Sequence, residues 1–262
     1  MEQLVFAPEE AAGLTLGGKA VGLLRAMQAG APVPPWRVIP VEAADRFLRR
    51  QDAGGSVASI SGHGELAQCC EALNVPPFGG IAVRSSADIE DREERSAAGL
   101  FETVFPEDAS QAAEAVARVL TSGRSAALDA YGAQAPQVAV VLQSRVAARM
   151  AGVLFSAAPS HAKLDTAYVE AVSGQGTALA DGSRTPSRFH LTFGNARAQS
   201  RISVDATPSD DGPQTLAPEL AEELLHWLLV LERAMGAAVD IEWAVDDTQL
   251  WILQVRAITA VA

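Results

Sequence analysis

The sequence predicts an α+β protein, because short apolar runs typical of strands are interspersed with stretches of helical periodicity. The chain has 262 residues, a length that suits one large domain or two small lobes. Hydrophobic residues make up 48% and charged residues 20% of the sequence. Both values are typical of globular proteins, so extended disorder is excluded. The sequence shows no fixed-period repeat, which disfavours a solenoid or a propeller.

Glycine and proline positions set the limits of the predicted elements. The first helix follows Gly17-Gly18 and stops before Gly30, and a loop rich in glycine and serine covers residues 52–64. We expect two lobes, residues 1–135 and 136–262. The predicted helices cover residues 20–29, 41–50, 108–120 and 218–235. The predicted strands cover residues 38–39, 81–83, 137–146, 152–156, 167–172, 189–193, 239–245 and 250–256.

The formal net charge of −12 disfavours a protein that coats nucleic acid or an anionic membrane. No apolar run reaches the roughly 18–20 residues that a membrane helix needs, and the N-terminus lacks the pattern of a signal peptide. The cysteines, Cys69 and Cys70, are adjacent and cannot join distant segments. We therefore expect a cytoplasmic protein in a reducing compartment, with this pair partly buried on a helix.

The last two predicted strands form a hairpin with a polar face. A three-residue loop at 247–249 pairs Asp240 with Arg256 and Glu242 with Gln254. The opposite face then holds apolar side chains throughout, at Ile241, Trp243, Val245, Trp251, Leu253 and Val255. Carboxylate and amide oxygens suit Mg²⁺, and an adjacent arginine suits a phosphate. An ordinary solvated face with two cross-strand pairs would give the same pattern.

Two further segments have the chemistry of a phosphate site. Gly17-Gly18-Lys19 begins a helix, where backbone N–H groups and the helix dipole attract anions. The chain has two lysines and 18 arginines, so it seldom uses lysine as a general surface cation. This scarcity favours a specific role for Lys19. Arg84-Ser85-Ser86 follows a predicted strand, and the loop at 99–103 could wrap phosphates. An ordinary turn and a surface loop are the alternatives, and the spacing is not that of a Walker A loop.

Taken in order, these segments resemble the N-terminal ATP-binding domain of the phosphoenolpyruvate synthase and pyruvate, phosphate dikinase family. Such domains also occur in phosphotransferases that inactivate rifamycins. The resemblance spans nearly the whole chain, and the ordered set of motifs is more specific than any single one. The matching stretches are residues 16–20, 29–35, 83–87, 98–103, 151–155, 174–176, 185–187, 240–243 and 253–259.

The resemblance implies an ATP-grasp-like, two-lobed nucleotide-binding fold that holds ATP and Mg²⁺ between its lobes. It assigns the phosphate cations and the covering loop to the first lobe, and the adenine pocket and the metal-binding hairpin to the second. The implied catalytic cations are Lys19, Arg84 and Arg256. The implied nucleotide contacts, besides these cations, are Gly99, Leu100, Phe101, Glu102, Thr103, Gln143, Arg145 and Glu170, and the implied metal ligands are Glu242 and Gln254.

The chain departs from the family pattern at several positions. Trp36 stands where members usually have glycine, Ala257 where they have proline, and Thr177 where they often have glutamate. We expect Trp36 to be tolerated at the start of a strand. The other two changes bear on fine tuning of the site rather than on ATP binding.

The activity that the resemblance implies is transfer of the pyrophosphoryl group of ATP to a histidine, with release of AMP. In the family a mobile domain carries this histidine, and none of the four histidines of this chain has its Gly-Gly-x-x-Ser/Thr-His context. We therefore expect a separate partner protein that carries the histidine and an acceptor-binding domain. The alternatives are a kinase or ligase that acts directly on a small metabolite, and a nucleotide-binding module without turnover.

Overall fold

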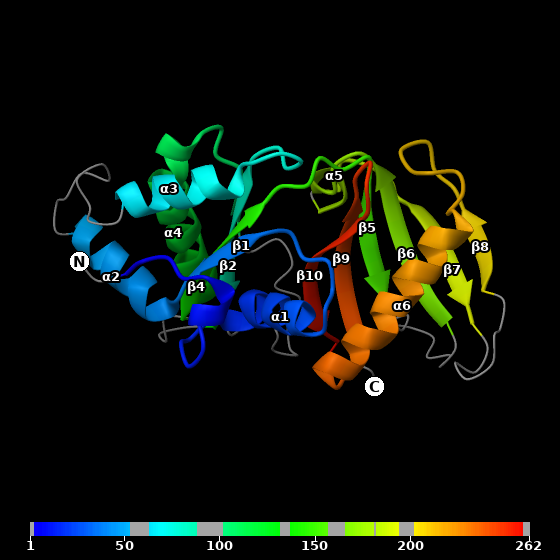
Figure 1. The fold of residues 1–262 in the computed structure, drawn as a ribbon, viewed down its shortest axis with the longest axis horizontal. Helices are drawn as coiled ribbons and strands as arrows, with labels where there is room; N and C mark the ends of the chain where they lie inside the picture. Colours follow the sequence, from blue (N-terminus) through cyan, green and yellow to red (C-terminus); the bar gives the residue numbers. More distant parts are fainter. Residues whose placement is uncertain are drawn as a thin grey trace. The chain divides into compact units, whose positions relative to one another are not determined.

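The computed structural model describes residues 3–52, 63–87, 102–131, 137–156, 166–180, 182–193 and 202–258. Its helices are α1 (Gly17–Gln28), α2 (Val41–Asp52), α3 (His63–Leu73), α4 (Ala112–Tyr131), α5 (Thr177–Ala180) and α6 (Pro218–Met235). Its strands are β1 (Trp36–Ile39), β2 (Ile81–Ala87), β3 (Thr103–Val104), β4 (Val138–Ser144), β5 (Met150–Phe155), β6 (Thr166–Ser173), β7 (Ser187–Thr192), β8 (Ser203–Thr207), β9 (Val239–Val245) and β10 (Leu250–Ala257). The predicted α+β class is confirmed (Figure 1).

The chain divides into two compact units. The first comprises Met1–Leu24 and Pro34–Val146, and the second comprises Arg25–Val33 and Ala147–Ala262. We predicted a boundary at residue 135, and the structure moves it to Val146. The reason is β4, which pairs with β1 and β2 and therefore belongs to the first sheet.

The first unit is built on an antiparallel sheet with the strand order β1-β4-β2-β3. Helices α2, α3 and α4 cover one face of this sheet (Figure 1). Each supplies a large side chain to the core, namely Phe47, Leu66 and Leu120, all at most 2% exposed. Burial of such a side chain contributes about 1.5–3 kcal/mol, so this face is the one that holds the unit together.

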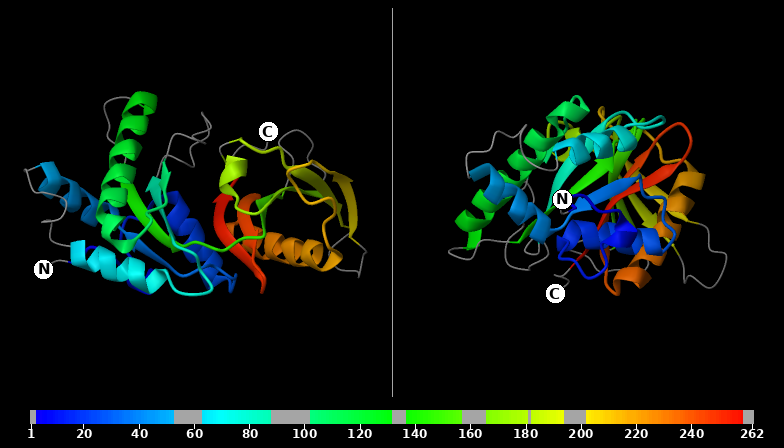
Figure 2. Two further views of the ribbon diagram at one scale, coloured as in Figure 1. Left: turned by 90° about the horizontal axis from the view of Figure 1, so that it is seen from above. Right: turned by 60° about the vertical axis from the view of Figure 1, so that its left-hand side comes forward.

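The second unit is built on an antiparallel sheet with the order β10-β9-β5-β6-β7-β8. Helix α6 covers one face of this sheet (Figure 2). It begins at Pro218 and ends at Gly236, which adopts a left-handed conformation with φ of 72°, as the sequence predicts. Leu224 and Leu228 of α6 pack in the same buried core as Trp243 of β9.

Several elements differ from the sequence-based expectation. Strand β2 continues to Ala87, so Arg84-Ser85-Ser86 lie within the strand rather than after it. Helix α4 passes through Gly123, where we expected it to have ended. Helix α5 and strands β3 and β8 were not predicted, and most of the predicted loop at 52–64 lies outside the described residues. Helix α3 carries Cys69, which is half-buried, and Cys70, which is buried, as we expected for that pair.

The closing hairpin keeps the predicted register where its polar pairs lie. Asp240 is opposite Arg256 and Glu242 is opposite Gln254, whereas a bulge at Leu253 shifts the remaining pairs by one residue. Trp251 and Leu253, predicted to be core residues, are consequently half-buried, and Leu250 and Ile252 are buried instead. The bulge therefore preserves the polar pairs and reverses the predicted orientation near the turn.

Candidate functional site

The first sheet has a second face, opposite its helix-covered core, and this face carries predicted site residues. Arg84 lies opposite Thr103 of β3 and Val141 of β4, and Ala82 lies opposite Gln143. Directly paired residues share a face, as do residues two apart on one strand. Arg84, Thr103 and Gln143 are therefore on the same face, while neighbours such as Val83 and Leu142 point into the core.

The N-terminus of α1, which carries Lys19, is tied to this same face. The backbone N–H of Ala20 donates to Oγ of Ser86 at 3.0 Å. Gly17 begins the helix with φ of +71°, and a Cβ at that position would lie 2.2 Å from the carbonyl oxygen of Ser86. Two segments that were separate weak signals in the sequence are thus joined at β2. Lys19 and Arg84 are both half-buried.

The predicted covering loop is described from Glu102 onward. Gly99, Leu100 and Phe101 lie outside the described residues. The carboxylate of Glu102 forms an ion pair with Arg118 of α4, which attaches the end of the loop to that helix. Thr103 follows as an exposed residue of β3, opposite Arg84.

Trp36 and Arg145 lie at neighbouring ends of the paired strands β1 and β4. Arg145 comes directly after β4, and its guanidinium carbon lies 5.0 Å from the ring centroid of Phe105. Its backbone N–H donates to the carbonyl of Gly80 at 2.9 Å. Trp36 is the first residue of β1 and is 2% exposed, so the strand entry accommodates it, as we expected.

The second unit carries the predicted metal and phosphate residues on β9 and β10. Nη2 of Arg256 donates to Oδ2 of Asp240 at 2.6 Å. Burial raises the pKa of Asp240, and the positive charge of Arg256 opposes that rise. Glu242 is half-buried, and its cross-strand partner Gln254 is 3% exposed. In the described part of the chain, no group of three or more His, Cys, Asp and Glu side chains forms a metal cluster.

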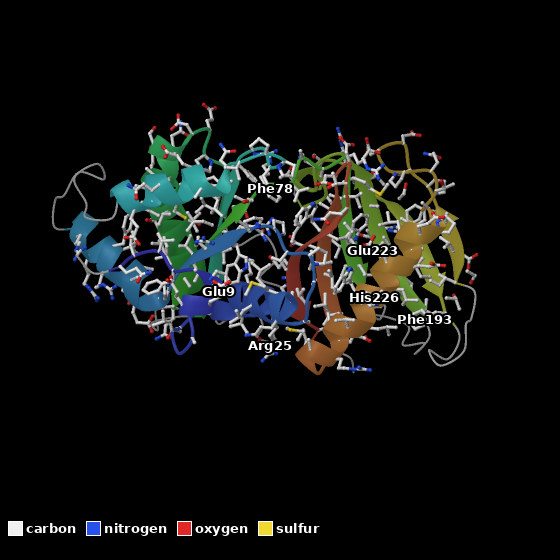
Figure 3. All side chains as sticks on the ribbon, viewed as in Figure 1. Glu9, Arg25, Phe78, Phe193, Glu223 and His226 are labelled. Carbon is white, nitrogen blue, oxygen red and sulfur yellow. The ribbon has the colours of Figure 1, made fainter. Side chains whose placement is uncertain are left out.

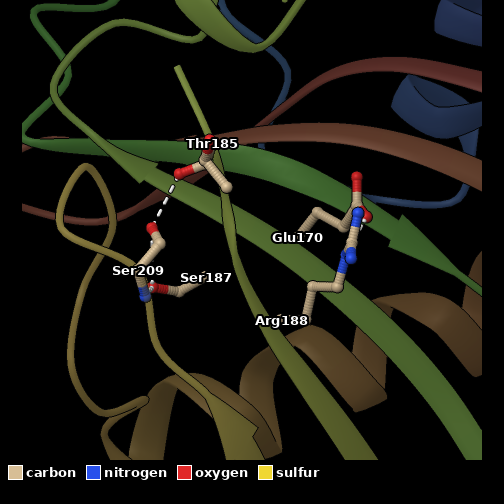
Figure 4. A network of polar contacts seen from close by, with 5 residues as sticks. All are labelled: Glu170, Thr185, Ser187, Arg188 and Ser209. Carbon is tan, nitrogen blue, oxygen red and sulfur yellow. Dashed lines mark hydrogen bonds and ion pairs between the residues drawn. The ribbon is translucent and has the colours of Figure 1, made fainter.

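Glu170 lies on the same face of the second sheet as Glu242. Across the strands, Glu242 is opposite Val153, Val153 is opposite Glu170, and Glu170 is opposite Arg188. Nε of Arg188 donates to Oε1 of Glu170 at 2.8 Å (Figure 4). The alternate residues, such as Leu154 and Phe189, point to the other face and are buried in the core that includes α6. The four predicted polar side chains of this unit, those of Glu170, Glu242, Gln254 and Arg256, therefore lie on one face.

The turn between β9 and β10 depends on a residue that the sequence analysis did not single out. The carboxylate of Asp246 accepts hydrogen bonds from the backbone N–H groups of Thr248 and Gln249, at 2.7 and 2.9 Å. It also accepts from the hydroxyl of Thr248 and from Nε1 of Trp251, both at 2.7 Å. Burial alone would raise the pKa of Asp246, but these hydrogen bonds outweigh it and lower the pKa to about 2. An aspartate at the first position of a tight turn is the signal that could have identified it.

The Thr185-Pro186-Ser187 motif has a structural role in the second unit. Oγ of Ser187 accepts from the backbone N–H of Ser209 at 2.8 Å, and Oγ of Ser209 donates to the carbonyl of Thr185 at 2.6 Å (Figure 4). A Cβ at Gly212 would lie 2.4 Å from Oγ of Ser187. The motif therefore anchors the chain that follows β8 against the start of β7.

The histidines that the structure describes with side chains lie on the second unit. His226 is exposed on α6, and Figure 3 shows it near Glu223 on that helix. His190 of β7 lies edge-on to the ring of Tyr168, with 4.6 Å between ring centroids. His161 lies outside the described residues, and His63 begins α3.

Comparison with known families identifies the class of domain. The family model described as the AMP/ATP-binding domain of pyruvate phosphate dikinase matches residues 63–262. The chain therefore belongs to this family of nucleotide-binding domains, and the resemblance found in its motifs is confirmed. No helix among the described residues has the length and apolar character needed to cross a bilayer.

Two relatives with known names are about three times as long as this chain. A prodigiosin synthesizing transferase, PigC, from Serratia marcescens is 30% identical over 94% of this chain and 32% of its own length. A phosphoenolpyruvate synthase from Aeropyrum pernix is 26% identical over 88% of this chain and 38% of its own length. The chain thus spans about a third of these relatives. Among solved structures, D-alanyl-alanine synthetase A from Vibrio cholerae aligns at 12% identity with a TM-score of 0.45, over 92% of this chain and 55% of that chain.

Proposed function

We propose that this chain is the ATP-binding component of a Mg²⁺-dependent phosphotransferase of the dikinase type. It would transfer the β,γ-pyrophosphoryl group of ATP to a histidine on a separate partner domain and release AMP. The observation that carries the proposal is the connection between Lys19 and Arg84. Both belong to family motifs, and Ser86 ties the helix of one to the strand of the other.

The cations supply what phosphoryl transfer needs from a protein. Such reactions require positioning and neutralisation of charge rather than covalent help. Lys19 and Arg84 of the first unit, with Thr103 opposite Arg84, suit the outer phosphates. Arg256 of the second unit is oriented by its ion pair with Asp240 and suits the γ-phosphate.

The donor set on the hairpin fits Mg²⁺. Glu242 offers a carboxylate and Gln254 an amide oxygen, and the burial of Gln254 restricts the positions its side chain can take. Magnesium is commonly bound by one or two protein oxygens and completes its shell with water and substrate phosphates. When bound, the ion would neutralise negative charge on the phosphates.

Glu170 suits the ribose rather than the metal. It lies two strand positions from Glu242 across the sheet, which corresponds to roughly 10 Å. The ion pair with Arg188 of β7 draws the Glu170 carboxylate toward the side of β6 that faces away from β9, and so away from a metal ion held by Glu242 and Gln254. A carboxylate accepts hydrogen bonds from hydroxyl groups, so we assign Glu170 to the ribose hydroxyls of the nucleotide. The family resemblance also assigns Gln143 and Arg145 to contacts with the nucleotide, and we keep that assignment in the proposal.

The transfer step has a defined balance of bonds. A ring nitrogen of the partner histidine attacks the β-phosphorus, and a nitrogen–phosphorus bond forms. The bond between the β-phosphorus and the oxygen that bridges it to the α-phosphorus breaks. AMP leaves with that oxygen, and Lys19, Arg84 and Arg256 stabilise the charge that moves. The terminal phosphoryl group of the pyrophosphorylated histidine would pass to water or to inorganic phosphate. The phosphoryl group that remains on the histidine would then be delivered to an organic acceptor.

The test is to identify the nucleotide product. The chain is incubated with Mg·ATP, with and without a histidine domain from a dikinase relative, and nucleotides are separated by chromatography. We expect AMP in amounts stoichiometric with the phosphorylated histidine domain, and very slow turnover without it. Rapid ADP release with a small molecule would contradict the dikinase assignment and favour a direct kinase. Absence of both products despite ATP binding would favour a nucleotide-binding module.

A further inference from the structure

We infer that Ser86 is a positioning residue that fixes the place of Lys19 relative to Arg84 on the first sheet. The inference rests on the proposed role of Lys19 and Arg84 as phosphate cations. Ser86 itself is not assigned a contact with the nucleotide. It acts on the position of Lys19 through the backbone of α1.

The hydroxyl of Ser86 acts as the cap of a helix to which it does not belong. The first N–H groups of an α-helix have no partner within the helix, and a polar side chain just before the helix usually accepts from one of them. In α1 that preceding residue is Leu16, whose apolar side chain cannot accept and is 5% exposed. Oγ of Ser86, 66 residues further along the chain, accepts from Ala20 at 3.0 Å instead. Ser86 is fully buried, so water cannot replace it.

Contacts with Ser86 flank Lys19 on both sides. Ala20, directly after Lys19, donates to the Ser86 hydroxyl. Gly17, two residues before Lys19, passes so close to the Ser86 carbonyl that a Cβ would lie 2.2 Å from that oxygen. The backbone of Lys19 is therefore held between two contacts with one residue. A glycine is required at position 17 because of both this approach and its φ of +71°.

Arg84 belongs to the same rigid strand. It lies two residues before Ser86 in β2, so both side chains leave the sheet on one face, with Cα atoms about 6.7 Å apart. The paired strand β4 runs along the whole of β2 and restricts its movement. Anchoring α1 at Ser86 therefore sets the spacing between the two cations before any nucleotide binds. Such preorganisation increases the affinity for a ligand that needs both charges.

The chain offers a matched control at the neighbouring position. Ser85 is also 0% exposed, but it is one residue along the strand and therefore points to the opposite, helix-covered face. Removing either hydroxyl changes a buried serine of β2 to alanine. Only the change at Ser86 disturbs the start of α1.

The experiment is calorimetric titration of the folded chain with Mg·ATP and with AMP. Ser86→Ala should lower the affinity for ATP roughly tenfold, the scale of one lost buried hydrogen bond, and change that for AMP less than twofold. Ser85→Ala should leave the ratio of the two affinities unchanged. In a Lys19→Ala background, Ser86→Ala should have little further effect on ATP, because it acts through Lys19. Gly17→Ala disturbs the same contact from the helix side and should reproduce the ATP-selective loss.

The outcomes separate this inference from the proposed function. If the wild-type chain binds no ATP, or Lys19→Ala weakens ATP and AMP equally, the assignment of the phosphate cations is wrong. If Lys19→Ala is selective for ATP but Ser86→Ala and Gly17→Ala are not, the positioning role of Ser86 is overturned. Full additivity of Ser86→Ala and Lys19→Ala would overturn it as well. Thermal unfolding of each variant shows that the titrated protein is folded.

Discussion

Asp246 stabilises the turn that brings β9 and β10 together, and we predict that Asp246→Asn destabilises the second unit by about 2 kcal/mol. The pKa of Asp246 falls from its ordinary value of 3.8 to about 2 in the folded protein. One tenfold change in proton affinity corresponds to about 1.36 kcal/mol, which gives the stated loss for the charged side chain. Asparagine keeps the shape of the side chain but lacks the charge that strengthens the four hydrogen bonds at 2.7–2.9 Å.

The sign of the pH dependence follows from the lowered pKa. The charged carboxylate favours the folded state, so its contribution is complete above about pH 4, where the unfolded residue is also charged. It decreases as the pH falls from about 4 toward 2, because the unfolded chain then binds a proton that the folded chain does not. The difference in unfolding free energy between wild type and Asp246→Asn should therefore be about 2 kcal/mol at pH 7 and should shrink over this interval.

Urea unfolding followed by tryptophan fluorescence measures this difference. Trp227, Trp243 and Trp251 all lie in the second unit, so the signal reports mainly on that unit. Asp247→Asn is the matched control, because Asp247 is the adjacent residue and is exposed. A loss below about 0.5 kcal/mol for Asp246→Asn at pH 7 would show that the charge of Asp246 does not stabilise the turn. A loss that stays constant down to pH 2.5 would show the same.

Three further predictions concern the nucleotide and the thiols. Lys19→Ala and Arg84→Ala should each weaken ATP binding roughly ten- to a hundredfold in calorimetry, the scale of one charge-assisted contact, and weaken AMP binding less; equal losses would move these residues away from the outer phosphates. Glu170→Gln should reduce the preference of the chain for ATP over 2′,3′-dideoxy-ATP, and an unchanged preference would contradict the ribose assignment. Burial raises the pKa of Cys69 to about 11 and that of Cys70 to about 12, so a thiol-alkylating reagent at pH 8 should label both rapidly after unfolding and slowly before it; rapid labelling of the folded protein would show that the pair is accessible.

The closing hairpin shows how far a sequence pattern can predict local pairing. Alternation of polar and apolar residues selects one register, and that register is present at Asp240–Arg256 and Glu242–Gln254. The pattern near the turn was misleading because Trp251 and Leu253 are apolar but half-buried. A bulge at Leu253 adds one residue to β10. Residues 250–253 are all apolar, so the sequence has no alternation there that could reveal the bulge.

The first sheet shows where local patterns stop being informative. Arg84-Ser85-Ser86 are polar, so an apolar run predicts that the strand ends before them. In the structure these residues continue β2, because β4 pairs with all of them and Ser86 bonds to α1. A contact between residues 66 positions apart depends on the tertiary fold. The motifs themselves, Gly17-Gly18-Lys19 and Arg84-Ser85-Ser86, were recognisable, but their connection was not.

We propose that the chain binds ATP together with Mg²⁺ held by Glu242 and Gln254. Calorimetric titration with ATP, in the presence of Mg²⁺ and in the presence of a chelator, tests this assignment. Wild type should bind ATP more weakly without the ion. The double variant Glu242→Ala, Gln254→Ala should bind ATP equally weakly in both conditions, at the level of metal-depleted wild type. Undiminished, Mg²⁺-dependent ATP binding by the double variant would show that Glu242 and Gln254 are not the metal ligands.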